Sequence, residues 1–143
     1  MLDLVLCVDD DPITLMLCKM VITRSDFAQE LISAQNGEEA LNYFDDLILS
    51  NLGMEMKRYP QLIFLDLNMP VMGGWEFLDH FAGEKYRNLF KDCKVIVLSS
   101  TIDPADINKA KTYPMVLDFL SKPISKEMLE DLKKILLKKK RSK

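Results

Sequence analysis

Five short apolar runs alternate along the chain with segments whose apolar residues recur at helical spacing, and this alternation is the strongest constraint on the fold. A short apolar run bounded by turn residues is typical of a strand buried on both faces of a sheet. We expect such strands at residues 3–8, 31–34, 62–65, 94–98 and 116–120. Helices between strands of this kind predict a parallel sheet with helices on both faces and right-handed crossovers. The predicted fold class is therefore α/β.

Helix signals occupy the segments between these runs. Asp11 is placed to cap a helix that starts at Pro12. The apolar positions of that helix are Ile13, Met16, Leu17, Met20 and Val21. Further helices are expected at residues 38–49 and 75–81, after Asp103-Pro104, and from Ser125 onward. Residues 50–60 lack clear periodicity, so we expect a loop that is longer than most such connections.

The length of 143 residues suits a single domain with one compact core, which we place at about residues 3–137, with a basic tail at 138–143. A content of 48% hydrophobic and 29% charged residues fits a soluble globular protein. No apolar run approaches the roughly 18 residues of a membrane span, and the start lacks a secretory signal, so we expect a cytoplasmic protein. Three cysteines, without metal-ligand spacing, are expected to be reduced core residues, namely Cys7, Cys18 and Cys93.

The net charge of −3 hides an asymmetry between the body and the tail. The tail contributes five positive charges, which leaves −8 for residues 1–137. An acidic body binds nucleic acid poorly, so we expect no nucleic-acid partner. The tail could contact nucleic acid or anionic lipid, but a solvated helix end is the favoured interpretation.

Polar residues follow four of the five predicted strands, and all strand ends of a parallel sheet meet at one edge. These residues are Asp9, Asp10, Asp66, Ser99 and Lys122. Three crowded carboxylates repel one another unless a cation neutralises them, and oxygen ligands suit Mg²⁺. A carboxylate beside Mg²⁺ is a competent nucleophile for phosphoryl transfer, while a lysine and a serine hydroxyl can bind phosphoryl oxygens. The combination predicts an aspartyl-phosphate site.

Each of these residues taken alone has an ordinary explanation. The aspartates at 9–11 could only cap a helix, and Asp66 by itself fits capping as well as chemistry. Ser99 could be a polar strand end and Lys122 a solvated lysine. Their joint occurrence after the first, third, fourth and fifth strands favours the phosphoryl site.

The same residues stand in motifs of a known family. They are Val8-Asp9-Asp10-Asp11-Pro12, Leu65-Asp66-Leu67-Asn68-Met69-Pro70 with Gly73-Gly74, Leu98-Ser99-Ser100 and Lys122-Pro123. Over about residues 3–137 the chain resembles the CheY-like receiver domain of response regulators in two-component signalling. The resemblance implies a flavodoxin-like (βα)₅ fold with strand order 2-1-3-4-5.

The resemblance also implies roles for the site residues. Asp66 would accept phosphate from a histidine kinase or a histidine phosphotransfer protein. Asp10 and Asp66 would bind Mg²⁺ directly together with the backbone carbonyl of Asn68, and Asp9 would act largely through a water on the ion. Lys122 would contact the phosphoryl group.

A switch is implied as well. Ser99 matches the family's switch hydroxyl and Phe119 its switch aromatic, although Phe119 could also be an ordinary aromatic of the core or surface. The Lys122-Pro123 bond is expected to be cis, which costs little before proline. The output surface would comprise the helix after Asp103-Pro104, the strand at 116–120 and the final helix.

We therefore expect a stand-alone phosphoacceptor switch, not a multiple-turnover enzyme, that binds a downstream protein or passes phosphate onward. The alternative is a haloacid-dehalogenase-like Mg²⁺ phosphohydrolase, but Ile13 stands where that family needs Thr or Ser, and its later acidic pair is missing. A flavin-binding flavodoxin fits less well, because aspartates replace a phosphate-cradling loop. Trp75, just after Gly74, is either a core residue or an exposed contact near the site.

Overall fold

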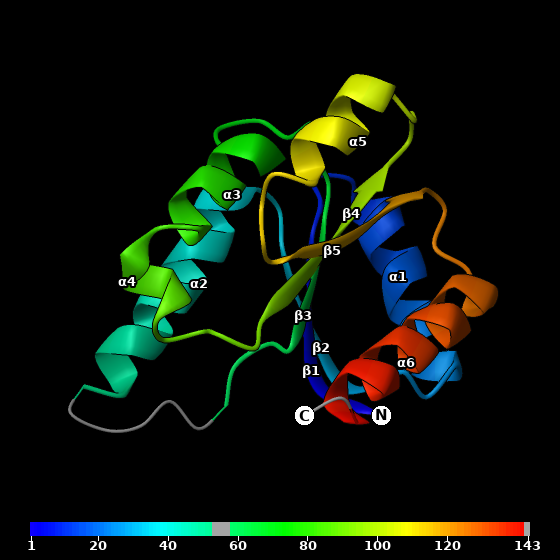
Figure 1. The fold of residues 1–143 in the computed structure, drawn as a ribbon, viewed down its shortest axis with the longest axis horizontal. Helices are drawn as coiled ribbons and strands as arrows, with labels where there is room; N and C mark the ends of the chain where they lie inside the picture. Colours follow the sequence, from blue (N-terminus) through cyan, green and yellow to red (C-terminus); the bar gives the residue numbers. More distant parts are fainter. Residues whose placement is uncertain (53–57, 142–143) are drawn as a thin grey trace.

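The computed structural model describes the backbone of residues 1–52 and 58–141 and the side chains of residues 1–52 and 58–136. Strands and helices alternate, as the sequence predicts (Figure 1). The elements in chain order are β1 Leu2–Val8, α1 Pro12–Arg24, β2 Ala28–Ala34, α2 Gly37–Ser50, β3 Leu62–Leu65, α3 Gly74–Phe81, α4 Glu84–Arg87, β4 Lys94–Ser99, α5 Pro104–Ala110, β5 Val116–Ser121 and α6 Lys126–Arg141.

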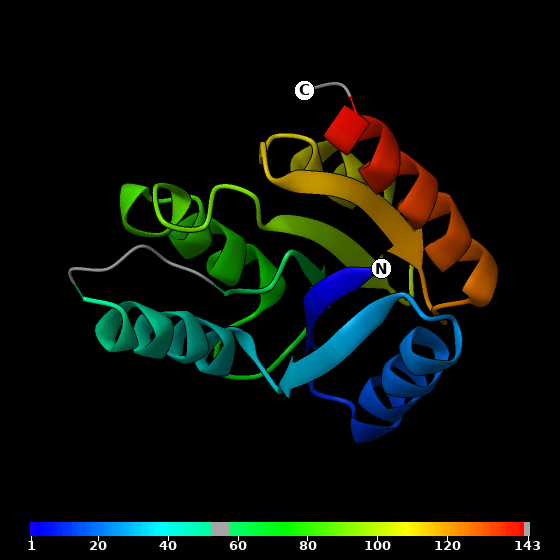
Figure 2. The same ribbon diagram turned by 90° about the horizontal axis from the view of Figure 1, so that it is seen from below.

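The five strands form one parallel sheet in the order β2-β1-β3-β4-β5. Helices α1 and α6 cover one face of the sheet, and α2, α3 and α4 cover the other (Figures 1 and 2). This arrangement confirms the predicted flavodoxin-like fold and its strand order. No helix in the described part of the chain is long and apolar enough to cross a membrane.

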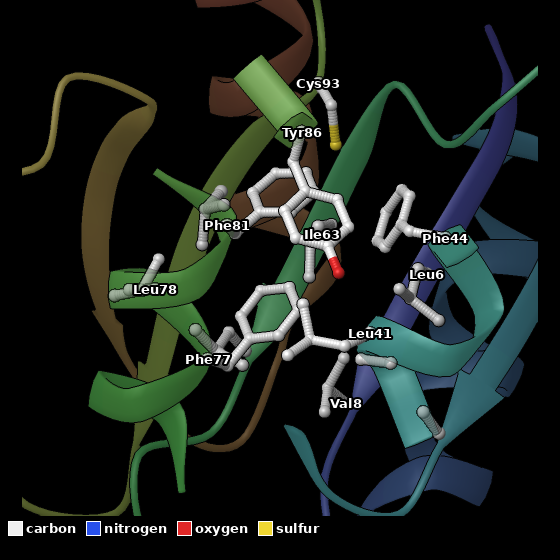
Figure 3. Close-up of a cluster of buried hydrophobic side chains, with 14 of the residues drawn as sticks. Leu6, Val8, Leu41, Phe44, Ile63, Phe77, Leu78, Phe81, Tyr86 and Cys93 are labelled. Atoms are coloured by element: carbon white, nitrogen blue, oxygen red, sulfur yellow. The ribbon is translucent and has the colours of Figure 1, made fainter. Parts of the chain in front are cut away.

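The core has two halves, one on each face of the sheet, because successive side chains of a strand point to opposite faces. Leu6 and Val8 of β1 pack with Phe44 of α2 and Phe77 of α3 in an aromatic-rich cluster (Figure 3). The alternate residues Val5 and Cys7 belong to the second cluster, which contains residues of α1 and α6. The central strands are buried on both faces, which explains their nearly continuous apolar sequences.

The structure contains six helices in its described residues, one more than the sequence predicts. The additional helix, α4, has one turn, which is too short to show a helical period. Tyr86 of α4 is buried, and its hydroxyl donates a hydrogen bond to Asp45 of α2 (2.7 Å).

Two further boundaries differ from the prediction. The strand β2 begins three residues earlier than predicted, at Ala28, because it is an edge strand whose exposed polar residues dilute its apolar pattern. The helix α2 continues through Ser50, so the predicted loop at 50–60 starts later. Residues 53–57 of that loop, and the side chains of the basic tail, lie outside the described residues.

The buried face of α1 differs from the apolar positions identified in the sequence. Cys18 and Ile22 are buried against the sheet, whereas Ile13 and Met16 are 64% and 55% exposed. Apolar residues occupy most of the circumference of α1, but only one side of a helix can contact the sheet. The three cysteines are buried free thiols, as predicted.

Candidate phosphoryl-transfer site

The carboxyl ends of β1, β3, β4 and β5 bring the predicted site residues to one edge of the sheet. Asp9 and Asp66 follow directly after Val8 and Leu65, which are paired residues of β1 and β3. The backbone N–H of Asp66 donates to the carbonyl of Val8 (2.9 Å), so the register of the sheet fixes the two aspartates side by side. The site is thus positioned by strand pairing.

Three carboxylates converge at this edge. Oxygens of Asp9, Asp10 and Asp66 all lie within 4.8 Å of one another. Asp9 and Asp66 are buried, and Asp10 is exposed, so the cluster opens to solvent on one side. A set of hard oxygen donors with an open side is the chemistry that suits Mg²⁺, which keeps several waters and needs few protein ligands. The residues therefore fit the ion that the sequence predicts.

The three consecutive aspartates have three different environments. A side-chain oxygen of Asp9 accepts a hydrogen bond from the backbone N–H of Asp11 (2.9 Å), which orients the buried carboxylate. Asp11 caps α1 by accepting from the backbone N–H of Ile13 (3.0 Å) and the hydroxyl of Thr14 (3.0 Å). These bonds hold the pKa of the Asp11 carboxyl below its usual range. Asp11 is thus the N-cap of α1, while Asp9 and Asp10 belong to the carboxylate cluster.

Lys122 supplies the positive charge of the site. Its Nζ lies 2.5 Å from Oδ2 of Asp9 and 3.4 Å from Oδ1 of Asp66. Its backbone N–H donates to the carbonyl of Ser99 (2.8 Å), which ties the end of β5 to the end of β4. The peptide bond between Lys122 and Pro123 is cis. One lysine therefore contacts two carboxylates that come from two different strands.

Lys122 only partly offsets the effects that disfavour a negative charge on Asp66. Burial and the neighbouring charge of Asp9 raise the pKa of Asp66, and Lys122 compensates only in part. Burial also opposes the charge of Lys122, but its hydrogen bond to Asp9 and the charges of Asp66 and Asp9 raise its pKa overall. The folded structure therefore disfavours ionisation of the Asp66 carboxyl, and a cation bound beside it would favour the ionised form.

A model of the family described as "Response regulator receiver domain" matches residues 5–134 of the chain. The chain belongs to the response-regulator receiver family. Receiver domains are parts of two-component systems, and this membership excludes a haloacid-dehalogenase-like phosphohydrolase.

Curated bacterial regulatory proteins and solved response-regulator structures are similar to the chain. The transcriptional regulatory protein HptR of Staphylococcus aureus is 31% identical over 91% of this chain and 44% of its own length. An uncharacterized response regulatory protein of Staphylococcus epidermidis is 30% identical over 96% of this chain and 47% of its own length. The chain thus spans about half the length of these curated relatives. A two-component response regulator from Cytophaga hutchinsonii has a crystal structure with a TM-score of 0.83, 31% identity and coverage of 96% of this chain and 98% of its own.

The loop between β3 and α3 packs closely against the backbone of Asp66 and Leu67. A Cβ atom added to Gly74 would lie 2.5 Å from the carbonyl oxygen of Asp66 and 2.9 Å from the Cα of Leu67. Only glycine at this position therefore allows α3 to start so close to the backbone of Asp66. Asn68 is exposed in the same loop. Val71 has a φ of 71°, an unfavourable conformation for a β-branched residue.

Ser99 and Phe119 lie on neighbouring strands. Ser99 is buried at the end of β4, and its hydroxyl oxygen accepts a hydrogen bond from the backbone N–H of Thr101 (3.2 Å). The hydroxyl proton therefore stays available for another acceptor. Phe119 of β5 pairs in the sheet with Val97 and is half-buried, and among the described residues it belongs to neither apolar cluster.

Two surface features lie near the site. Trp75 is half-buried and stacks on Tyr113, with ring centroids 6.0 Å apart, while Lys109 Nζ lies 4.6 Å from the Trp75 ring centroid. Trp75 thus packs against the segment after α5 and also contacts solvent. The second feature is the exposed apolar side of α1, beside Asp10 and Asp11. An excess of apolar positions over those needed for one helix face is the sequence signal for such a surface.

Proposed function

We propose that this receiver domain accepts a phosphoryl group on Asp66 from a phosphohistidine of a histidine kinase or a phosphotransfer protein. The observation that carries the proposal is the environment of Asp66: a buried carboxylate at a strand end, with two further carboxylates and one lysine within reach. In the transfer, a carboxylate oxygen of Asp66 forms a bond to phosphorus while the bond from the histidine nitrogen to phosphorus breaks. The released imidazole then takes up a proton as the pH requires.

The chain's own residues have separate tasks in this step. The position of Asp66 is fixed by strand pairing and by the close approach of Gly74, so the acceptor is preorganised. The Lys122 ammonium, 3.4 Å from Asp66, is within reach of oxygens of a phosphoryl group on that carboxylate. Asp9, Asp10, Asp66 and the backbone carbonyl of Asn68 would hold Mg²⁺, which when bound offsets the charge of the carboxylates and the phosphoryl oxygens.

The surface next to the site favours a protein as the phosphoryl donor. Ile13, Met16 and Leu17 expose an apolar side of α1 immediately after the aspartates. A contiguous exposed apolar surface beside a reactive group is typical of a protein contact. A small phosphorylated metabolite would not need it.

We further propose that Ser99 couples phosphorylation of Asp66 to a conformational change. Its hydroxyl proton would bind a phosphoryl oxygen, and Phe119 on the adjacent strand would turn inward behind it. The affected output surface is formed by α5, β5 and α6, and it would bind a downstream protein or accompany onward transfer of phosphate. One phosphoryl group is held per chain, so the domain works as a switch and not through repeated turnover.

The test is phosphorylation by acetyl phosphate with and without Mg²⁺, followed by intact-mass measurement. The wild-type chain should gain one phosphoryl group only when Mg²⁺ is present, and Asp66→Asn should gain none. Asp103→Asn is the matched control, because Asp103 also follows a strand and caps a helix but lies outside the carboxylate cluster. Labelling of Asp66→Asn at the wild-type level would overturn the proposal.

The switch has a separate test. With beryllofluoride and Mg²⁺, hydrogen exchange of α5, β5 and α6 should change in the wild-type chain. In Ser99→Ala, beryllofluoride should still bind while this change is lost, because the acceptor remains and the reporting hydroxyl is gone. An unchanged response in Ser99→Ala would exclude Ser99 as the switch residue and leave Asp66 as the acceptor.

A further inference from the structure

A cavity of about 380 Å³ lies at the edge of the sheet opposite to Asp66. Its lining comes from the residues that lead into β4 and β5, from α4 and from the end of α3. Because the strands are parallel, their amino ends lie on the other side of the molecule from the carboxylate cluster. The cavity is therefore independent of the phosphoryl-transfer site.

The floor of the cavity is apolar. Pro114 and the half-buried Met115 line it, and Phe81, Phe90 and Cys93 contribute the 1–3% of their surface that is exposed. Phe81 and Cys93 belong to the aromatic-rich cluster (Figure 3). Burial raises the pKa of the Cys93 thiol, so the floor carries no negative charge at neutral pH. An occupant of this space must bring an apolar body of its own.

The rim of the cavity is cationic. Arg87, Lys91 and Lys94 line it, against a single glutamate, Glu84. None of these three cations forms an ion pair in the part of the chain that the structure describes. Lys85 of the same helix, by contrast, pairs with Asp45 (2.9 Å) and does not line the cavity. Residues 1–137 have a net charge of −8, so a rim with three cations has the opposite charge to the rest of the body.

We propose that this cavity binds a small aryl carboxylate, with its ring against the apolar lining around Met115 and Pro114 and its carboxylate at the cationic rim. The volume lies in the range of sites for small organic molecules, roughly 300–1,000 Å³. A neutral apolar compound would gain nothing from the cations of the rim, and inorganic phosphate would gain nothing from the apolar lining. A cationic ligand would be repelled. An apolar lining beside guanidinium and ammonium groups favours an anion with an apolar ring.

The experiment uses the fluorescent aryl anion anilinonaphthalenesulfonate as the probe, with naphthoate as the competing aryl carboxylate. The probe should bind at one saturable site, naphthoate should displace it, and the neutral naphthalenemethanol should not. Arg87→Gln and Lys94→Gln should each weaken binding by about tenfold, as expected for loss of a charged hydrogen bond. Lys85→Gln, which removes the same charge from the same helix outside the cavity, should bind as the wild type does.

Three results would overturn the inference. They are equal weakening by Lys85→Gln, displacement by naphthalenemethanol as effective as by naphthoate, and loss of the signal in Leu17→Gln. The last would place the probe on the exposed side of α1 instead of in the cavity. All substituted cations are on the surface, so the variants are expected to fold, and thermal unfolding of each variant checks this. The measurement needs no phosphoryl donor, so its outcome does not depend on the function proposed for Asp66.

Discussion

At the carboxyl edge of the sheet three aspartates crowd around one lysine, whereas at the amino edge three cations surround an apolar cavity with one glutamate. Each edge holds an excess of one sign of charge that the surrounding residues do not neutralise. Between the edges, the sheet and its two apolar clusters contain the large buried side chains. We infer that stability resides in the middle layer, while each edge keeps an excess of charge that a ligand of opposite charge would offset.

The largest effect is expected in the layer between the edges. Phe81 packs against Phe44, Phe77, Tyr86 and Phe90 and also lines the cavity. Phe81→Ala should lower the free energy of unfolding by about 3–5 kcal/mol, because it leaves a void in a close-packed cluster. Urea denaturation measures this loss.

The control for this variant is Leu89→Ala, since Leu89 is an exposed apolar residue just after α4. It should change stability by less than about 0.5 kcal/mol. A similar small loss in Phe81→Ala would mean that the aromatic cluster does not hold the fold together. That result would contradict the inference that stability resides in the layer between the two edges.

The next effect concerns the acidic edge. Asp10→Ala should weaken Mg²⁺ binding by roughly tenfold or more, because it removes one of three converging carboxylates. Asp11→Ala removes the same charge one residue away but should leave Mg²⁺ affinity near the wild-type value, and it should cost about 1 kcal/mol of stability through the lost helix cap. Titration calorimetry and denaturation separate the two effects. Equal losses of Mg²⁺ affinity would show that net charge, and not the geometry of the cluster, governs binding.

A smaller effect is the pH dependence of stability in the absence of Mg²⁺. The pKa of Asp66 is raised in the folded state by burial and by Asp9, so the folded chain holds the proton more tightly than the unfolded chain. Wild-type stability therefore falls as pH rises through the pKa of Asp66. Asp66→Asn lacks this loss and should be the more stable chain at neutral pH, with the difference vanishing in acid.

Thermal unfolding in chelator across the acid-to-neutral range measures this difference. Saturating Mg²⁺ should reduce or reverse it, because the ion binds the wild-type cluster more tightly. A wild-type chain that is more stable than Asp66→Asn at neutral pH without Mg²⁺ would contradict the inference that the acidic edge keeps an excess of charge.

The smallest effect is in the loop beneath the site. Val71 has a positive φ and an exposed side chain, so Val71→Asn should raise the free energy of unfolding by about 1 kcal/mol through relief of strain. Val71→Ala keeps a Cβ at the same φ and lacks the local hydrogen bonds of asparagine. It should therefore raise the free energy of unfolding by less than Val71→Asn does. Equal gains from both variants would attribute the effect to removal of exposed apolar surface.

The parts of the structure that the sequence predicts are those set by local patterns. Apolar runs such as 62–65 identify the strands, and Asp11-Pro12 and Asp103-Pro104 mark helix starts that the structure contains. Because parallel strands end at one edge, the convergence of Asp9, Asp10 and Asp66 was also predictable. The resemblance to receiver domains supplied the strand order.

The remaining features depend on packing between distant segments. One turn of helix at Glu84–Arg87 has no period to detect. The side of α1 that contacts the sheet was not decided by its apolar positions, since these surround the helix, and Cys18 with Ile22 faces inward. The cavity exists only where α4 and the segments before β4 and β5 meet, so no sequence pattern marks it.

The most direct test of the phosphoacceptor assignment locates the phosphoryl group in the wild-type chain. After phosphorylation with acetyl phosphate and Mg²⁺, borohydride reduction converts an aspartyl phosphate to homoserine, and peptide mass spectrometry finds its position. We predict homoserine at position 66 alone. Homoserine at position 9 or 10, or a phosphoryl group on a side chain that borohydride does not reduce, would contradict the assignment of Asp66 as the acceptor.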